Sequence, residues 1–335
     1  MISNLWIASV LVLVLATGCG EGVSLPGTVR LGYFANVTHA QALIGAVRGD
    51  FAWELKAPVK THTFNAGPAL IEALFAGEID LAYIGPAPAA NAYLRSHGKA
   101  LRIISGAAAN GVSVVARTGS GIRTFADLRG KRIATPQYGS TQDISARHFV
   151  TKVLGATLIE DGGDTTIVPV ANADQLALFR QGELDAAWAP EPWASRMVHE
   201  LHAVRITDEK DLWPAHRVST AVVVVSPAFQ EAHPELVERF LRAHAAITRW
   251  IGDEPEAAAA IVAHELERLT GKPLDGAVVR EAMRRVEFTT DPLEESIQEL
   301  SRWSVELRMS PQGGDLRGLV DRRSLDRVML ARSAP

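Results

Sequence analysis

The sequence LFAGEIDLAYIGPA at residues 74–87 is echoed by LFRQGELDAAWAPE at residues 178–191. In both copies, apolar residues at helical spacing end at a glycine, Gly77 or Gly182, which can take the left-handed conformation that closes a helix. A Glu-apolar-Asp connection then leads into a short apolar strand and a loop that contains proline. One copy alone is a common helix-to-strand connection, but two copies in matching contexts predict two α/β units of the same design.

The loops that follow the two repeat strands are expected to face each other. Ligands of open α/β sheets bind beyond the carboxyl ends of the strands. The loop with Gly85 and Pro86 and the loop at residues 190–193 both occupy that position. Two α/β lobes with facing loops would close around a ligand.

The composition is that of a soluble globular protein with room for two domains. The chain has 335 residues, of which 47% are hydrophobic and 21% charged, and its formal net charge is -4. No basic field of the kind that binds phosphate backbones is present, so we expect no nucleic-acid partner.

The N-terminal sequence is typical of an export signal. An apolar run at residues 5–16 precedes the one cysteine of the chain, Cys19, in the context Ala-Thr-Gly-Cys. The run is shorter than the ~20 residues that span a bilayer. We expect residues 1–19 to be a lipoprotein-type signal with lipidation at Cys19, although no Lys or Arg precedes Arg30. The alternative is a lone cysteine in a cytosolic protein.

The order of strands and helices predicts where the chain passes between lobes. We expect residues 28–117 to form the first part of lobe 1 and residues 118–217, which begin in a polar Gly-rich stretch, to form lobe 2. Residues 218–335 would return to lobe 1 through an apolar β-rich strand at 218–225. Helical patterns then follow at residues 229–251, 256–269, 276–286 and 292–309, and we expect them to pack on lobe 1.

Hydroxyl groups at two predicted helix starts are candidate ligand contacts. Thr38 and His39 follow the first strand of lobe 1, and Ser140 and Thr141 follow a strand of lobe 2. Hydroxyls and first-turn amides at such positions donate to anionic oxygens. The alternative is plain helix capping, for example by Thr38, and for His39 a ring satisfied within the core.

Most of the remaining candidates lie in small or polar loops that also follow predicted strands, whereas Gln41 lies in the predicted helix after the first strand. These candidates are Gln41, Gly67, Gly85, Pro86, Asn110, Gly139, Gln142, Glu191 and Trp193. A carboxylate beside an anionic ligand costs ~4 kcal/mol at 4 Å in an effective dielectric near 20. Glu191 therefore either turns away to backbone amides or Arg196, or meets a ligand with N–H donors, and we favour the first. Trp193 is either a cleft wall or lobe core.

Sequence motifs of catalytic sites are absent. The chain has no His-Glu-x-x-His, no Gly-x-Ser-x-Gly and no phosphate-binding Gly-x-x-x-x-Gly-Lys. His199 and His202 are three residues apart without a third clustered ligand. We therefore expect no metal site, no cofactor and no catalysed reaction.

Four segments together resemble a family of binding proteins. The segments at residues 32–42, 83–87, 136–143 and 189–194 are similar to the substrate-binding proteins of the nitrate, sulfonate and taurine branch of ABC importers. The resemblance covers roughly residues 29–225 well and the C-terminal helices more loosely. It implies an α/β fold of two lobes, the type II periplasmic-binding-protein fold, with two crossings between the lobes.

The resemblance implies that a small anionic or zwitterionic molecule is bound between the lobes and delivered to an ABC permease and its ATPase. We expect a monomer at the periplasm or cell surface, attached to the membrane through lipid. One alternative is an enzyme on the same fold, similar to a thiamine-pyrimidine synthase or a chorismate-derived dehydratase. Another is a ligand sensor, and the identity of the ligand stays open.

Overall fold

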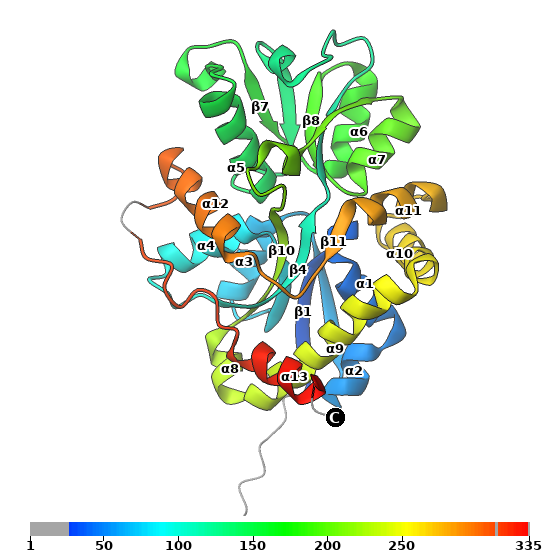
Figure 1. Ribbon diagram of the computed structural model, residues 1–335, viewed down its shortest axis with the longest axis vertical. Coiled ribbons are helices and arrows are strands. Elements are labelled where there is room, and N and C mark those ends of the chain that lie inside the picture. Colours follow the sequence, from blue (N-terminus) through cyan, green and yellow to red (C-terminus); the bar gives the residue numbers. More distant parts are fainter. Residues whose placement is uncertain (1–26, 312–313, 334–335) are drawn as a thin grey trace, which may run out of the picture.

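The computed structural model describes residues 27–311 and 314–333 and shows two α/β lobes, one above the other in Figure 1. The first lobe contains a six-stranded sheet in the order β11-β4-β10-β3-β1-β2, and the second a five-stranded sheet in the order β7-β6-β8-β5-β9. The expected signal at residues 1–19, with Cys19, lies outside the described residues. No helix in the described ranges is long and apolar enough to cross a membrane.

The first sheet is mixed, and the carboxyl ends of its parallel strands face the second lobe. Parallel pairing joins β1 to β2 and to β3, whereas β10 pairs antiparallel with β3 and β4. The strands are β1 Val29–Phe34, β2 Val59–Phe64, β3 Leu81–Ile84, β4 Arg102–Asn110, β10 Ser219–Val225 and β11 Val286–Phe288. The helices between them are α1 Ala40–Arg48, α2 Asp50–Leu55, α3 Gly67–Phe75 and α4 Pro86–Arg95.

The second sheet repeats this design on a smaller scale. β6 pairs parallel with β7 and β8, and β5 pairs antiparallel with β8 and β9. The strands are β5 Val112–Ala116, β6 Arg132–Thr135, β7 Thr166–Pro169, β8 Ala186–Pro190 and β9 Val204–Asp208. The helices are α5 Thr141–His148, α6 Asn172–Gln181 and α7 Trp193–Leu201.

The echoed sequence forms the same structure in both lobes, as α3-β3-α4 and as α6-β8-α7. The aspartate of each copy has the same structural role. Asp80 accepts hydrogen bonds from the backbone amide of Arg30 at 2.8 Å and from its Nε at 3.0 Å. Asp185 accepts the same two bonds from Arg132 at 3.0 and 3.1 Å. Each aspartate thus fixes the first residues of the neighbouring parallel strand.

The first crossing between lobes lies earlier than we predicted. We placed residues 112–116 in lobe 1, but β5 belongs to the second sheet, so the chain crosses at Gly111 between β4 and β5. Gly111 has a φ of 73°, and a β-carbon there would lie 2.5 Å from Val286 Cγ2. The apolar run continues through the crossing without a break, and this continuity hid the boundary. The chain returns to the first lobe just before β10.

Most C-terminal helices cover the first sheet, as predicted, but α12 does not belong to one lobe. The helices that the structure describes in this part of the chain are α8 Pro227–Ala232, α9 Pro234–Asp253, α10 Pro255–Thr270, α11 Gly276–Arg285, α12 Glu294–Glu306 and α13 Arg323–Ser333. Leu300 and Trp303 of α12 are buried in the apolar cluster of the second lobe with Val114 and Phe149, whereas Ile297 joins a cluster of the first. The prediction that all these helices pack on lobe 1 was therefore wrong for α12.

Candidate functional site

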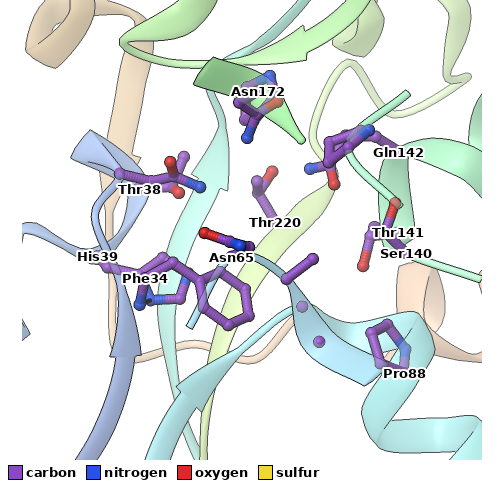
Figure 2. Close-up of a pocket in the computed structure, with 16 residues that line it drawn as sticks. Phe34, Thr38, His39, Asn65, Pro88, Ser140, Thr141, Gln142, Asn172 and Thr220 are labelled. Atoms are coloured by element: carbon purple, nitrogen blue, oxygen red, sulfur yellow. Dashed lines mark hydrogen bonds between the residues drawn. The ribbon is translucent and has the colours of Figure 1, made fainter. Parts of the chain in front are cut away.

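A narrow cavity lies between the lobes where the strands of both sheets end. The space between its lining residues, together with the open solvent at its mouth, is about 350 Å³. In Figure 2, Thr38, His39 and Asn65 lie on one side, and Ser140, Thr141 and Gln142 on the other. The lining consists of Phe34, Asn36, Thr38, His39, Asn65, Ala66, Gly67, Gly85, Pro88, Pro136, Ser140, Thr141, Gln142, Asn172, Pro190 and Thr220.

Helix starts from both lobes meet at this cavity. The first residues of α3, α5 and α6 are Gly67, Thr141 and Asn172, and all three line it. Neither α3 nor α6 has a side chain that caps its first amides. Free amides and the helix dipole at these ends favour a negative group by about 0.3 to 1 kcal/mol each, and up to ~2 in partly buried geometry.

The lining carries no ionic charge. Lys, Arg, Asp and Glu do not occur among the lining residues. Burial lowers the pKa of His39 to about 3, so its ring is neutral at physiological pH. The His39 Nδ1 accepts a hydrogen bond from the Phe34 amide at 3.2 Å, which leaves the proton on Nε2. The polar groups that the described residues offer to this cavity are therefore hydroxyl, amide and imidazole dipoles.

The lobes touch each other around the cavity, so the structure is a closed one. Thr141 Oγ1 accepts a hydrogen bond from the amide of Ala87 in the opposite lobe at 3.3 Å. The Trp193 indole N–H donates to Asn36 Oδ1 at 2.8 Å, and the Val37 amide donates to the Glu191 carbonyl at 3.1 Å. The last two contacts join the first turn after β1 to the segment after β8, and the first joins α4 to the start of α5.

Seven predicted site residues lie at the cavity: Thr38, His39, Gly67, Gly85, Ser140, Thr141 and Gln142. Ser140 is the N-cap of α5, and its Oγ accepts from the Asp143 amide at 3.2 Å. Thr38 is not the helix cap that one interpretation of the sequence offered, because it lies inside a 3-10 turn, Val37–His39, that precedes α1. The hydroxyl of Thr38 is thus not committed to capping.

Four other predicted residues do not line the cavity, and three of them form hydrogen bonds that hold neighbouring segments in place. The Gln41 side chain donates through Nε2 to the Ala107 carbonyl at 2.7 Å and to Thr248 Oγ1 at 3.3 Å. Asn110 accepts from the Val218 amide at 3.1 Å and so ties the two crossing segments together. The Gly139 amide donates to Asp143 Oδ2 at 3.0 Å. Pro86, the first residue of α4, is buried beside the cavity but does not line it.

Glu191 and Trp193 also lie outside the lining. The buried Glu191 carboxylate accepts from the Ser195 amide at 3.1 Å and from Arg205 Nη2 at 3.2 Å. Burial raises the pKa of Glu191, and the nearby Arg205 charge opposes this rise. Glu191 is therefore turned away from the cavity, as we favoured, but its cation is Arg205, whereas Arg196 pairs with Glu200 at 2.6 Å.

Sequence reasoning missed part of the lining, including Phe34, Asn36, Asn65, Asn172 and Thr220. The repeat contained the signal for one of them. The helix before the second copy starts at Asn172, just as the helix before the first copy starts at Gly67. The described residues contain no group of three or more His, Cys, Asp or Glu side chains able to hold a metal ion.

A family model, that of the NMT1-like family, matches residues 25–266. The chain belongs to the NMT1-like family. Among curated relatives of this NMT1-like chain, four Brucella proteins whose names mention binding without a ligand are 27% identical over 217 residues. That match covers 64% of this chain and 63% of theirs. The taurine-binding periplasmic protein of Escherichia coli K12 is 26% identical over 204 residues, 60% of each chain.

Solved structures confirm the predicted fold. The alkanesulfonate-binding protein SsuA of Xanthomonas axonopodis pv. citri, bound to MOPS, aligns with a TM-score of 0.71 at 22% identity. The alignment covers 89% of the NMT1-like chain and 99% of SsuA. The two-lobed α/β architecture that the sequence predicted is therefore that of a periplasmic binding protein.

Proposed function

We propose that this chain is the extracytoplasmic substrate-binding component of an ABC importer. The family, the taurine-binding relative and the structural likeness to SsuA support a binding protein. The ligand we propose is a small organic anion or zwitterion with a sulfonate-like or carboxylate-like head. Closure of the two lobes over it would present the closed form to the permease, because a ligand favours the state that it binds more tightly.

One observation carries this proposal, namely the meeting of helix starts from both lobes at an uncharged cavity. A strongly acidic head group keeps its charge at neutral pH and is stabilised by amide and hydroxyl donors without an arginine. A cationic head group would find only the positive ends of helices. The sequence predicted that hydroxyls and first-turn amides of both lobes donate to an anionic oxygen. We call this arrangement an oxyanion clamp, and it remains our proposal for the ligand class.

Calorimetry and thermal shift across a panel of alkanesulfonates, taurine, nitrate, dicarboxylates and pyrimidines test the proposal. A ligand at a thousandfold excess over its dissociation constant is expected to stabilise the protein by ~4 kcal/mol. Thr141→Val keeps the shape but removes the hydroxyl, and we expect ~5- to 150-fold weaker binding. Thr270→Val, on α10 and bonded only within its own helix, is the matched control. Stabilisation by neutral apolar compounds alone would contradict the oxyanion clamp.

We also propose that Cys19 carries lipid and attaches the protein to a membrane on the extracytoplasmic side. The apolar run and the small residues before Cys19 support this. Mass spectrometry of protein expressed in a bacterium is expected to find a lipid-modified Cys19 terminus. An unmodified Met1 terminus on cytosolic protein would contradict it. We propose no catalysed reaction, and bound ligand should be recovered chemically unchanged.

A further inference from the structure

The end of the first lobe that points away from the cleft exposes an unusual aromatic side chain. α2 buries Phe51 and Leu55 against the core, where Phe51 stacks on Phe240 at 4.9 Å. Trp53, on the opposite face of this short helix, is 79% exposed. Figure 1 shows α2 and α13 at the same end of the lobe, and α13 exposes Leu330 to 72%.

Cationic side chains share a surface depression with this tryptophan. The depression is lined by Trp53, Glu54, Lys56, Arg239 and Arg242. Its one carboxylate, Glu54, is paired with Arg242 at 2.7 Å. Within the described part of the chain, Lys56 and Arg239 form no ion pair with a carboxylate, and Arg239 Nη1 donates only to the Leu55 carbonyl, at 3.3 Å. The patch therefore presents an aromatic ring with net positive charge.

The N-terminal segment joins the folded protein beside this patch. The Val29 amide donates to the Pro58 carbonyl at 2.9 Å, so residues 27–28 lie next to residues 57–58. Lys56 is the adjacent residue. Gly27 is eight positions after Cys19 in the sequence, and an extended chain over eight positions spans at most about 28 Å. A chain attached at Cys19 would hold this end of the lobe near the attachment point.

We propose that the patch of Trp53, Lys56, Arg239 and Arg242 is a membrane-docking surface that lies on anionic phospholipid headgroups. Tryptophan favours the headgroup level of a bilayer because its ring is apolar and its N–H is polar. Lys and Arg are attracted to the negative surface of anionic lipid. The inference rests on the membrane attachment proposed above for Cys19, and it places the cleft on the far side of the first lobe from the lipid.

Quenching of tryptophan fluorescence by brominated lipid tests the proposal on the full chain. The vesicles contain brominated phosphatidylcholine, either alone or with about 30% phosphatidylglycerol. The difference in quenching between the wild-type protein and Trp53→Phe isolates the signal of Trp53 from those of the other tryptophans. We expect this signal on vesicles with phosphatidylglycerol, a weaker one on phosphatidylcholine alone, and a decrease with added salt.

Removal of the two unpaired cations gives the decisive comparison. Lys56→Gln with Arg239→Gln is expected to weaken docking about fivefold for each cation. Lys152→Gln with Arg180→Gln makes the same charge change on exposed residues of the second lobe and should leave the Trp53 signal intact. Equal loss in both double variants, or no Trp53 quenching on any vesicle, would overturn the proposal.

Ligand affinity and the Cys19 modification are measured in the same samples. Intact ligand binding and lipidated Cys19 without Trp53 quenching would overturn the docking surface alone. Absence of ligand binding by the wild-type protein would instead contradict the proposed function.

Discussion

Gly85 lines the cavity at a point where the two lobes lie close together. A β-carbon at this position would lie 2.4 Å from Thr141 Oγ1 in the opposite lobe. The backbone of Gly85 has φ -66° and ψ 145°, which alanine adopts without strain. An added methyl group would therefore collide only when the lobes are closed.

We predict that Gly85→Ala weakens ligand binding at least tenfold, equivalent to ~1.4 kcal/mol, without lowering the unfolding midpoint of the ligand-free protein. Calorimetry and thermal melts measure the two effects separately. Gly252→Ala is the control, since no atom lies within 4 Å of a β-carbon there. Unchanged affinity of Gly85→Ala would show that the lobes do not need this approach for binding.

His244 makes stability depend on pH because its neutral form is fixed by two partners. Its Nδ1 lies 2.8 Å from Tyr83 Oη, and its Nε2 lies 2.9 Å from the Gly106 carbonyl, so Nε2 donates and Nδ1 accepts. Burial lowers the pKa of His244 to about 4, compared with about 6.5 in an unfolded chain. The unfolded chain therefore takes up a proton first as the pH falls.

We predict that the free energy of unfolding is highest above pH 6.5 and falls as the pH decreases from 6.5 to 4. His244 contributes a slope of ~1.4 kcal/mol per pH unit in this window. Denaturant titrations at several pH values measure the slope, and His244→Gln should be flatter than the wild-type protein by about that amount. Parallel curves for the two proteins would contradict the assignment.

At the element scale, the effect of the helix dipole can be tested at the start of α6 by replacing one side-chain amide with a carboxylate. Asn172 lines the cavity as the first residue of α6, and its Oδ1 accepts from Gln175 Nε2 at 3.3 Å. Asn172→Asp keeps the size and this acceptor but adds a negative charge. A carboxylate at a helix start stabilises the helix by about 0.3 to 1 kcal/mol.

We predict that Asn172→Asp raises or preserves the unfolding midpoint, while it weakens the binding of an anionic ligand. Repulsion of up to ~4 kcal/mol at 4 Å corresponds to a loss between tenfold and about a thousandfold. Asn172→Ala removes the amide without adding charge and should lose much less affinity. Equal losses in Asp and Ala variants would mean that the ligand brings no negative charge to this helix start.

The duplicated elements were predictable because their physical cause is local in sequence. A glycine that closes a helix and an aspartate that binds the neighbouring strand recur at the same spacing in both lobes. The short strand β11 and the placement of α12 were not predictable in this way. α12 is amphipathic whichever lobe it covers, and its partners, α4 and α5, lie far away in the chain.

In the candidate site too, the residues that could be predicted are those whose position follows from the local sequence. Ser140 and Thr141 follow a strand and open a helix, which the sequence indicates directly. Thr220 and Phe34 reach the cavity from within strands, and only the three-dimensional order of β1 and β10 brings them there. Glu191 is an example of a candidate contact that is not made. It lies in a loop at the predicted end of a strand, but it pairs with Arg205 on the later strand β9 and is turned away from the cavity.

At the scale of the whole molecule, we expect affinity to depend on contacts that close the lobes as well as on those that touch the ligand. Trp193 donates across the lobes to Asn36 at 2.8 Å but does not line the cavity. Trp193→Phe removes this donor and keeps the aromatic ring in the lobe core. The variant therefore changes the balance between open and closed states without a change to the ligand contacts.

We predict that Trp193→Phe weakens ligand binding about fivefold, since one hydrogen bond contributes ~1 kcal/mol to the closed state. The loss follows from a smaller population of the closed form, which reduces apparent affinity in proportion. Small-angle scattering at saturating ligand should give the same radius of gyration for variant and wild-type protein, because excess ligand restores closure. The ligand-free variant should be at least as extended as the ligand-free wild type. A variant that remains extended at saturation would show that Trp193 defines the closed geometry itself, and unchanged affinity would show that this contact does not form in solution.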